Sequence, residues 1–366
     1  MKILFAIKAM NDAEGGAERV IADVSSGLAE KGHEVSLLSF DPMGGQSFYP
    51  LNPKIRRLCL GIGSPLKKAT FLETCARTFA LRRTVKKERP DVVVAFMHSM
   101  FIPMAFALIG TGTPVVGSEH IVPQHYKSRR LEFLLLMASA LLMKRITALS
   151  ESVKAMYPKF LQKRMVAMPN PVHAPTGSAD PTGAGRDRKI ILNVGRLDPQ
   201  KDQRTLIAAF ATLAADYPEW DVRIFGNGPL RGELEGMVQQ HELQGRVLLP
   251  GTTPEIANEY QRAQIFALPS VYESFGLATA EAMSFGLPCI GFADCPGTNE
   301  LIVDEENGVL VGGVNRISDF AGSMKKLMDD PELRVKLGKG ARQSVQHFTP
   351  EKIFDRWEKL LREEAL

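Results

Sequence analysis

The sequence IILNVGRLDPQKD, residues 190–202, decides the fold class of this protein. Five mostly apolar residues, 190–194, lead into Gly195, and a helical stretch begins near Asp202. Strands this short and this apolar suit a parallel sheet that helices cover on both faces. The stretch therefore predicts one strand, turn and helix of a doubly wound α/β domain, whose ligands bind beyond the carboxyl ends of its strands.

Nine other short apolar runs alternate with helical stretches along the chain. In one such helical stretch, Ala17, Val20 and Ile21 share a face at 3.6 residues per turn. The runs are residues 3–7, 35–40, 92–96, 114–117 and 146–149 in the first half, and 222–225, 247–249, 265–268 and 288–291 after residue 190. This alternation predicts two α/β domains in tandem.

A segment rich in Pro, Gly, Ala and Asp, residues 170–188, separates the two series and is typical of a linker. We place a first Rossmann-like domain at 1–172, the linker at 173–188 and a second Rossmann-like domain at 189–349. A Thr-Pro helix start predicts an amphipathic helix over 350–366, which we expect to pack back on the first domain. Two such domains facing each other would form a cleft, with one substrate held by each wall.

The charge of the chain is divided unevenly between its halves. The 366 residues are 45% hydrophobic with four cysteines, which excludes a disordered chain, a collagen-like repeat and a disulfide scaffold. The total net charge is only +4. However, residues 1–172 hold 24 Lys and Arg against 13 Asp and Glu, a net charge of +11, and the remainder carries −7. A basic half joined to an acidic half predicts an anionic partner for the first domain.

The sequence predicts a cytoplasmic protein that contacts a membrane only at its surface. The apolar run at residues 1–7 is shorter than a signal peptide requires and ends at Lys8. Residues 131–143 are apolar but include Glu132 and fall short of the roughly 20 residues of a bilayer span, so we expect a packed helix there. The four cysteines show no metal-ligand spacing and are expected to be reduced thiols.

Charged residues follow the strands of the second domain at spacings that suit a diphosphate and a sugar. Arg196 and Lys201 lie five residues apart at the ligand edge, where Arg can grip an anion as a fork and Lys as a point charge. Glu273 follows a later strand, and Glu281 lies within the next helix. Carboxylates accept hydrogen bonds from vicinal diols, and the helix start at Gly276 can face an anion with its N–H groups.

A second glycine-rich turn, Gly15-Gly16, follows the first strand and leads directly into a helix. Two glycines permit close backbone approach, and the free N–H groups of the helix start favour an anion. On its own this turn fits a tight connection between strand and helix equally well.

These motifs together resemble the GT-B glycosyltransferases of family 4, in order and spacing over nearly the whole chain. The resemblance rests on Gly15-Gly16, on the Gly-Arg to Gln-Lys-Asp run ending at Asp202, on Gly226-Asn227-Gly228-Pro229 and on the spacing of Glu273 and Glu281. It implies the GT-B fold and a retaining transferase that uses a nucleotide-diphosphate sugar.

The resemblance also implies a role for each matching residue. Arg196 and Lys201 would hold the diphosphate, Gly16 would approach it from the first domain, and Glu281 and Glu273 would bind the ribose and the donor sugar. The remaining implied donor-binding residues are Gly15, Gly226, Asn227, Leu249, Gly251, Thr252, Phe275, Gly276, Leu277 and Ala278. Of these, residues 275–278 would close the phosphate pocket, and residues 249–252 would follow a strand and line the base.

His120 is the second candidate catalytic residue beside Glu273. It follows a strand of the first domain, where the family places a histidine near the donor sugar, and we expect it to orient substrate and stabilise charge rather than act as a general base. The chain contains no D-x-D triplet, so we expect no metal at the diphosphate and no cofactor. Arg196, Lys201 and the helix start would stabilise the leaving group instead.

Basic residues of the first domain are candidates for contact with an acceptor or a membrane. They are Arg82, Arg83, Lys86, Lys87, Lys127, Arg129 and Arg130. Basic helices beside apolar side chains can lie on anionic lipid, although solvated helix faces carry similar charge. Nucleic acid is not expected, because no aromatic stacking platform accompanies the charge.

In Gly15-Gly16-Ala17-Glu18-Arg19-Val20, in residues 47–51 (SFYPL) and in Asp294-Cys295-Pro296, the chain also resembles the members of the family that extend lipid-linked saccharides. After Pro296 the chain reads Gly297-Thr298-Asn299-Glu300, where that subgroup commonly has an Arg-Glu pair, so the donor sugar is not assigned beyond a UDP-hexose or UDP-N-acetylhexosamine. The acceptor expected is a polyprenyl-phosphate-linked saccharide of polysaccharide assembly. Alternatives are the same chemistry on a soluble acceptor, or a catalytically inactive module that binds nucleotide-sugar or membrane. A dinucleotide oxidoreductase fits less well, because Arg231 stands where its fingerprint needs a third glycine.

Overall fold

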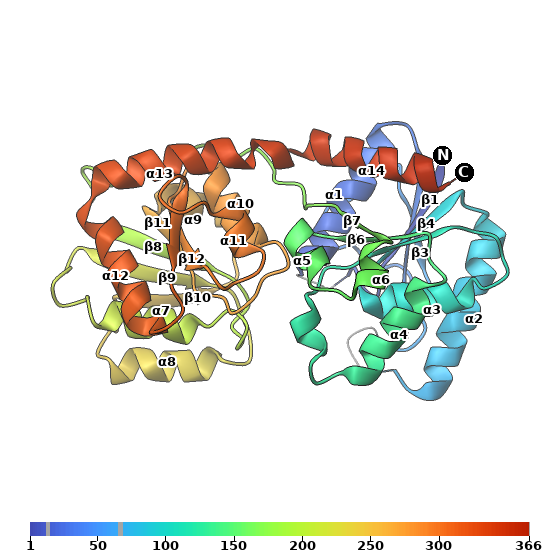
Figure 1. Ribbon diagram of the computed structural model, residues 1–366, viewed down its shortest axis with the longest axis horizontal. Coiled ribbons are helices and arrows are strands. Elements are labelled where there is room, and N and C mark those ends of the chain that lie inside the picture. The colour runs from blue at the N-terminus through green and yellow to red at the C-terminus, as the bar shows by residue number, and fades with distance from the viewer. Residues whose placement is uncertain (12–14, 65–68, 366) are drawn as a thin grey trace. The chain divides into compact units, whose positions relative to one another are not determined.

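The computed structural model of the protein describes residues 1–11, 15–64 and 69–365. The chain divides into two compact units, the first formed by Met1–Pro171 with Pro350–Leu366 and the second by Val172–Thr349. Each unit is built on one sheet whose strand pairs are all parallel, with helices on both faces (Figure 1). The prediction of two doubly wound α/β domains is confirmed.

Unit 1 contains a seven-stranded sheet of order β3-β2-β1-β4-β5-β6-β7. Its strands are β1 (Lys2–Ala6), β2 (Glu34–Ser39), β3 (Arg56–Cys59), β4 (Val92–Phe96), β5 (Val115–Ser118), β6 (Arg145–Ala148) and β7 (Met165–Ala167). Its helices are α1 (Gly16–Glu30), α2 (Phe71–Glu88), α3 (His98–Ala107), η1 (Pro123–Tyr126), α4 (Arg130–Ala140), α5 (Glu151–Ala155), α6 (Lys159–Gln162) and α14 (Pro350–Glu364). The strand order reverses at β1, so the loops after β1 and β4 diverge there and leave room for a ligand.

Unit 2 contains a six-stranded sheet of order β10-β9-β8-β11-β12-β13. Its strands are β8 (Lys189–Val194), β9 (Trp220–Phe225), β10 (Val247–Gly251), β11 (Ile265–Leu268), β12 (Cys289–Phe292) and β13 (Gly308–Val311). Its helices are α7 (Gln203–Ala211), α8 (Arg231–Gln240), α9 (Ile256–Arg262), α10 (Leu277–Ser284), α11 (Thr298–Leu301), α12 (Arg316–Asp329), α13 (Pro331–Ser344) and η2 (Val345–Phe348). The order reverses between β8 and β11, and the predicted diphosphate and sugar residues follow these two strands.

The C-terminal helix α14 belongs to unit 1 and packs on α1. The Glu358 carboxylate accepts hydrogen bonds from Lys31 Nζ at 2.9 Å and pairs with His33 Nε2 at 3.2 Å. Trp357 is buried and stacks on Phe96 with ring centroids 6.0 Å apart. At Gly27 a Cβ would collide with the Phe354 ring, so only glycine permits this close approach of α1 and α14.

Residues 173–188, which the sequence assigns to a linker, fold against unit 2. Arg334 is almost fully buried and its Nη2 donates to the Thr182 carbonyl at 2.9 Å. Its guanidinium also lies over the Trp220 ring, 5.2 Å from the centroid. A buried guanidinium needs several acceptors, and the carbonyls of this segment supply part of them.

Two local expectations are met only in part. Residues 131–143 were expected to form a packed helix, and α4 does form, but Leu131, Leu134 and Leu135 are 70%, 57% and 40% exposed. Residues 249–252 were expected to follow a strand, whereas β10 runs through Gly251. The irregular register of β10 against β9 between Leu248 and Gly251 explains the second error, because a bulge extends the strand past a proline.

Candidate functional site

The loop after β8 carries the two cations that the sequence assigns to a diphosphate. Lys201 Nζ lies 2.6 Å from Glu273 Oε1, and the lysine side chain is 18% exposed. Arg196 is 72% exposed, and its Nε donates to Asp198 Oδ2 at 2.6 Å. The loop therefore holds Lys201 in a buried ion pair, while the Arg196 guanidinium extends into solvent beside the carboxyl edge of the sheet.

Asp198 shapes this loop, a role that the sequence analysis missed. Its buried carboxylate accepts the backbone N–H groups of Gln200 and Lys201 on Oδ1, at 3.1 and 3.2 Å, and Arg196 on Oδ2. An aspartate that accepts backbone N–H groups two and three residues ahead forms an Asx-type turn. The Asp-Pro pair at 198–199 was the available signal for such a turn.

Glu273 lies in the loop between β11 and α10 and is only 5% exposed. Its Oε1 accepts hydrogen bonds from Lys201 Nζ and from Ser270 Oγ, both at 2.6 Å. Its backbone N–H donates to the Pro296 carbonyl at 2.9 Å. Within the described part of the chain Oε2 makes no hydrogen bond, so this oxygen can accept a substrate hydroxyl without breaking the pair with Lys201.

The sequence predicts an anion-binding helix end at the start of α10. Gly276 precedes the helix with φ 81°, a left-handed conformation that favours glycine, and Leu277 and Ala278 form its first turn. Phe275 is buried and packs edge-on against Phe348, with centroids 5.3 Å apart. The first N–H groups of a helix have no acceptor within the helix, so α10 can donate to a phosphate at this end.

Glu281 lies in the second turn of α10, and its Oε2 accepts a hydrogen bond from the Tyr260 hydroxyl at 3.1 Å. Tyr260 is buried and stacks on Phe285. Tyr260, which the sequence did not single out, therefore fixes the orientation of Glu281, the residue predicted to bind the ribose.

The loop after β9 crosses the loop that carries Arg196. A Cβ at Gly226, whose φ is 142°, would collide with the Gly195 carbonyl, and a Cβ at Gly228 would collide with the Leu197 carbonyl. The Leu197 N–H donates to the Asn227 carbonyl at 3.0 Å. Both glycines are therefore required for the two loops to pass each other, a packing role beyond the binding role that the sequence assigns to Gly226.

Arg231 joins several of the predicted donor-binding residues of unit 2. Its Nη1 donates to Asn227 Oδ1 at 3.1 Å, and its Nη2 donates to the Leu249 carbonyl at 2.7 Å. The Gly226 N–H donates to the Gly251 carbonyl at 2.8 Å. Asn227, Leu249, Gly226 and Gly251 thus lie together at the ends of β9 and β10, and exposed Thr252 follows them.

His120 follows β5 in unit 1 and is 9% exposed. Its ring stacks on Phe96, with centroids 4.9 Å apart. The Thr147 hydroxyl donates to Ser118 Oγ at 2.9 Å, and Ser118 Oγ lies 3.0 Å from His120 Nε2. If Ser118 donates to Nε2, the proton of the neutral ring lies on Nδ1. Among the described residues Nδ1 has no hydrogen-bond partner, so it can donate to a ligand.

Burial determines the protonation of His120 and of its neighbour Glu119. It lowers the pKa of His120 to about 3, so the imidazole is neutral at physiological pH. It raises the pKa of Glu119 to about 8, although Tyr126 and the backbone N–H of Ile121 donate to this carboxyl group. A histidine with so low a pKa is a poor general base, and the orienting role expected from the sequence does not require one.

The remaining predicted residues of unit 1 lie at two places. Gly15 precedes α1 and Gly16 begins it, after residues 12–14, which lie outside the described part of the chain. Of the predicted basic residues, Arg82 donates through Nη1 to the Ala107 and Ile109 carbonyls, and Arg129 pairs with Glu132 at 3.4 Å. The exposed ones are Arg83, Lys86 and Lys87 on α2, and Lys127, Arg129 and Arg130 before and at the start of α4.

Two family models match the chain in succession. Residues 14–174 match the model described as Glycosyltransferase Family 4, and residues 179–344 match Glycosyl transferases group 1. The chain is a family 4 glycosyltransferase.

Relatives that match the full length of the chain are also named as glycosyltransferases. The glycosyltransferase is 28% identical to an uncharacterized glycosyltransferase of Haemophilus influenzae, over 98% of this chain and 99% of the relative. It is 29% identical, over 99% of both chains, to a Campylobacter jejuni N-acetyl-D-galactosaminyltransferase whose name specifies a diNAcBac-PP-undecaprenol-linked saccharide.

Solved structures show that its fold is GT-B. Sucrose-phosphate synthase from Thermosynechococcus elongatus matches 99% of both chains with a TM-score of 0.83 and 22% identity. HepE from Anabaena, solved with UDP and glucose, matches 99% of both chains with a TM-score of 0.80 and 19% identity. Among the described residues of the glycosyltransferase, no helix combines the length and apolar composition that a bilayer span needs.

Proposed function

We propose that this glycosyltransferase transfers a hexose or N-acetylhexosamine from a UDP-sugar, with retention, onto a lipid-linked saccharide at the cytoplasmic face of a membrane, as a step of glycan assembly. The observation that carries the proposal is the set of groups at the carboxyl edge of the unit 2 sheet: exposed Arg196, the Lys201–Glu273 pair and the start of α10. The names of the Campylobacter relative and of the HepE complexes support the acceptor and donor classes.

These groups suit the departure of a nucleoside diphosphate. As the bond between the sugar C1 and the phosphate oxygen breaks, negative charge develops on the diphosphate. Arg196, Lys201 and the N–H groups of α10 stabilise this charge without a metal, and each preorganised donor of this kind is commonly worth about 3–4 kcal/mol. The acceptor oxygen then bonds to C1 on the same face, and its proton passes to the departing phosphate oxygen, because neutral His120 is too weak a base to take it.

Binding and product analysis test the proposal together. A panel of UDP-, ADP- and GDP-sugars should raise the Tm of the protein only within one nucleotide class, because a ligand that binds the native state stabilises it by mass action. The product formed with a polyprenyl-diphosphate saccharide should keep the anomeric configuration of the donor. No stabilisation by any nucleotide-sugar, or an inverted product, would refute the assignment. Turnover on free saccharides alone would favour the soluble-acceptor alternative.

The surface of α4 supports the membrane part of the proposal. Leu131, Leu134 and Leu135 are exposed on this helix, and Leu141 and Leu142, which follow it, are 61% and 42% exposed. The spacing of Leu131, Leu134 and Leu135 places these three on one side of the helix, so an apolar stripe faces solvent. The flanking cations are Lys127, Arg129, Arg130 and Lys144. An apolar stripe with a basic rim is the pattern by which helices lie in the interface of an anionic bilayer.

Replacing Leu131 and Leu134 by serine should weaken binding to anionic vesicles by roughly 30-fold. Each leucine loses part of its burial in lipid, about 1 kcal/mol for side chains of this exposure. Vesicle co-sedimentation measures the loss, and turnover with a short, water-soluble acceptor analogue should not change. The matched control is Val314→Ser with Ile317→Ser, two exposed apolar residues of unit 2. If both double variants bind vesicles equally well, the apolar stripe of α4 is not the surface that binds the membrane.

A further inference from the structure

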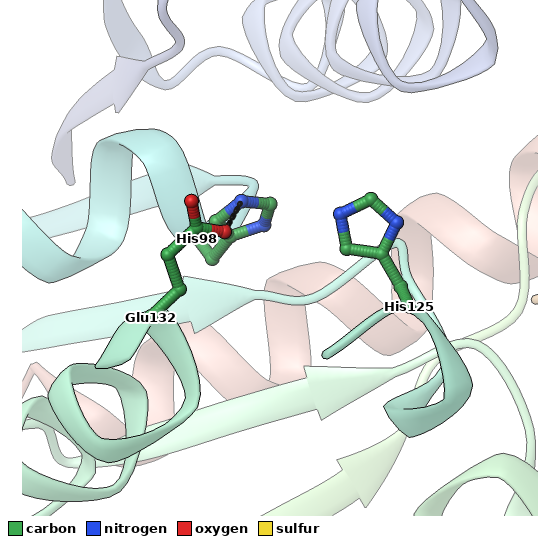
Figure 2. Close-up of side chains that lie close together, drawn as sticks. All are labelled: His98, His125 and Glu132. Carbon is green, nitrogen blue, oxygen red and sulfur yellow. Dashed lines mark ion pairs between the residues drawn. The ribbon is translucent and has the colours of Figure 1, made fainter. Parts of the chain in front are cut away.

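Two histidines and a glutamate of unit 1 meet outside the residues assigned above. His98 begins α3 directly after β4, His125 lies in η1, and Glu132 lies in the first turn of α4. One ligand atom from each of the three lies within 4.8 Å of the other two. Figure 2 shows the His98 ring and the Glu132 carboxylate side by side, with the His125 ring on a separate turn beside them.

The surroundings of His98 suit a metal ligand. Its side chain is 12% exposed, and its Nε2 lies 3.8 Å from Glu132 Oε2. An imidazole nitrogen offers its lone pair to a cation that the carboxylate also binds.

The backbone before His98 is strained. Met97 has φ 68° and ψ 147°, a conformation that glycine adopts far more readily than methionine. Such a residue costs about 1–3 kcal/mol, and strained residues cluster at functional sites. Here the strained residue turns the chain from β4 into α3 and sets the position of His98.

The geometry points to a divalent transition-metal site formed by His98, His125 and Glu132, with Zn²⁺ as the best fit. Two imidazoles and one carboxylate form a ligand set of catalytic zinc sites, in which a water or substrate oxygen takes the fourth position. Tetrahedral zinc with bonds of about 2.1 Å separates its ligand atoms by about 3.4 Å. His98 Nε2 lies 3.8 Å from Glu132 Oε2, close to this spacing, and the Glu132 side chain is 42% exposed and can rotate.

The cost of this movement is small. Glu132 Oε2 lies 3.4 Å from Arg129 Nη1, and both side chains are more than 40% exposed. A surface ion pair of this kind contributes about 0–1 kcal/mol, far less than a zinc bond to a carboxylate. The site lies at the carboxyl edge of the unit 1 sheet, so the open coordination position would face ligands bound at that edge. The donor-binding residues of unit 2 take no part in it.

Metal binding by the full-length protein tests the inference independently of its transferase activity. After removal of metal, titration with Zn²⁺ against a chromophoric chelator should show one site per chain. His98→Ala and His125→Ala should each weaken it at least 100-fold, and Glu132→Gln, a surface change that spares the fold, at least tenfold. His241→Ala, which removes an exposed histidine of unit 2, should bind as the unaltered protein does.

Cobalt distinguishes this site from binding by thiols. Co²⁺ bound to His98, His125 and Glu132 should give visible absorption without a thiolate charge-transfer band, whereas capture by exposed Cys75 would produce one. The inference is overturned if the unaltered protein binds no stoichiometric zinc, if the band is present, or if Glu132→Gln and the histidine variants bind zinc as tightly as His241→Ala.

Discussion

Lys201→Ala should reduce kcat/KM for the sugar donor by roughly 10²–10³-fold, the loss that follows removal of one preorganised charge from a developing anion. Lys201 is held by Glu273 at 2.6 Å in the loop where the diphosphate is proposed to bind. The same change leaves the buried Glu273 carboxylate without its cation, which costs about 3–5 kcal/mol of stability. Low activity of the single variant could therefore reflect unfolding.

A double variant separates the two effects. Lys201→Met with Glu273→Gln removes both charges and keeps the volume, so its free energy of unfolding in urea should lie within about 2 kcal/mol of the unaltered protein. Release of nucleoside diphosphate should still be lost. Arg204→Ala is the control, because Arg204 lies three residues away and pairs with Glu233 on the surface. A stable double variant that turns over donor at the normal rate would show that the pair is structural only.

The central strands of both sheets follow from the sequence, whereas three edge strands do not. β3, β7 and β13 were missed, and each lies at the edge of its sheet. An edge strand pairs on one side only and is often short or polar. β3 contains Arg56 and Arg57, and β7 has three residues. Their pairing depends on the neighbouring strand, which a local pattern cannot reveal.

The candidate site likewise contains some residues that a local motif identifies and others that only the folded structure identifies. Arg196, Lys201, Glu273 and Glu281 could be selected because each lies in a motif that follows a strand. The partners of two of them were not selected: Tyr260, which donates to Glu281, lies in another helix, and Ser270, which donates to Glu273, shows its role only in the folded loop. The zinc ligands are likewise separated by 26 and 6 residues and belong to three elements.

The sequence could not predict which side of α4 is buried, and the reason here is different. Leucines occur on several sides of this helix, so its apolar residues show no single face that must be buried. In the structure Leu136 faces the core, whereas Leu131 and Leu134 face solvent. Apolar content predicts a helix here, but only the packing of α3 and α4 determines which leucines stay exposed.

His120→Ala should lower kcat by roughly 10²–10³-fold while the donor KM changes little. The structure leaves Nδ1–H of a neutral ring free to donate, and a positioned hydrogen-bond donor or acid–base group is typically worth 10²–10⁴-fold. Because burial lowers the pKa of His120 to about 3, the pH profile of kcat should show no acid limb near 6.5. If His120→Ala keeps a tenth or more of the normal kcat, His120 does not act as the proposed hydrogen-bond donor.

Ser118→Ala tests how His120 is held. Ser118 does not contact the substrate in this scheme; it fixes the proton of His120 on Nδ1 through its hydrogen bond to Nε2. Without that bond the neutral ring loses the donor to Nε2 and can carry its proton on either nitrogen, so the pKa of His120 should rise. We expect a kcat about tenfold lower and an acid limb that moves toward neutral pH. Ser25→Ala, a buried serine of α1 that donates to the Ala22 carbonyl, is the matched control. A lower kcat with an unchanged pH profile would assign Ser118 to packing alone.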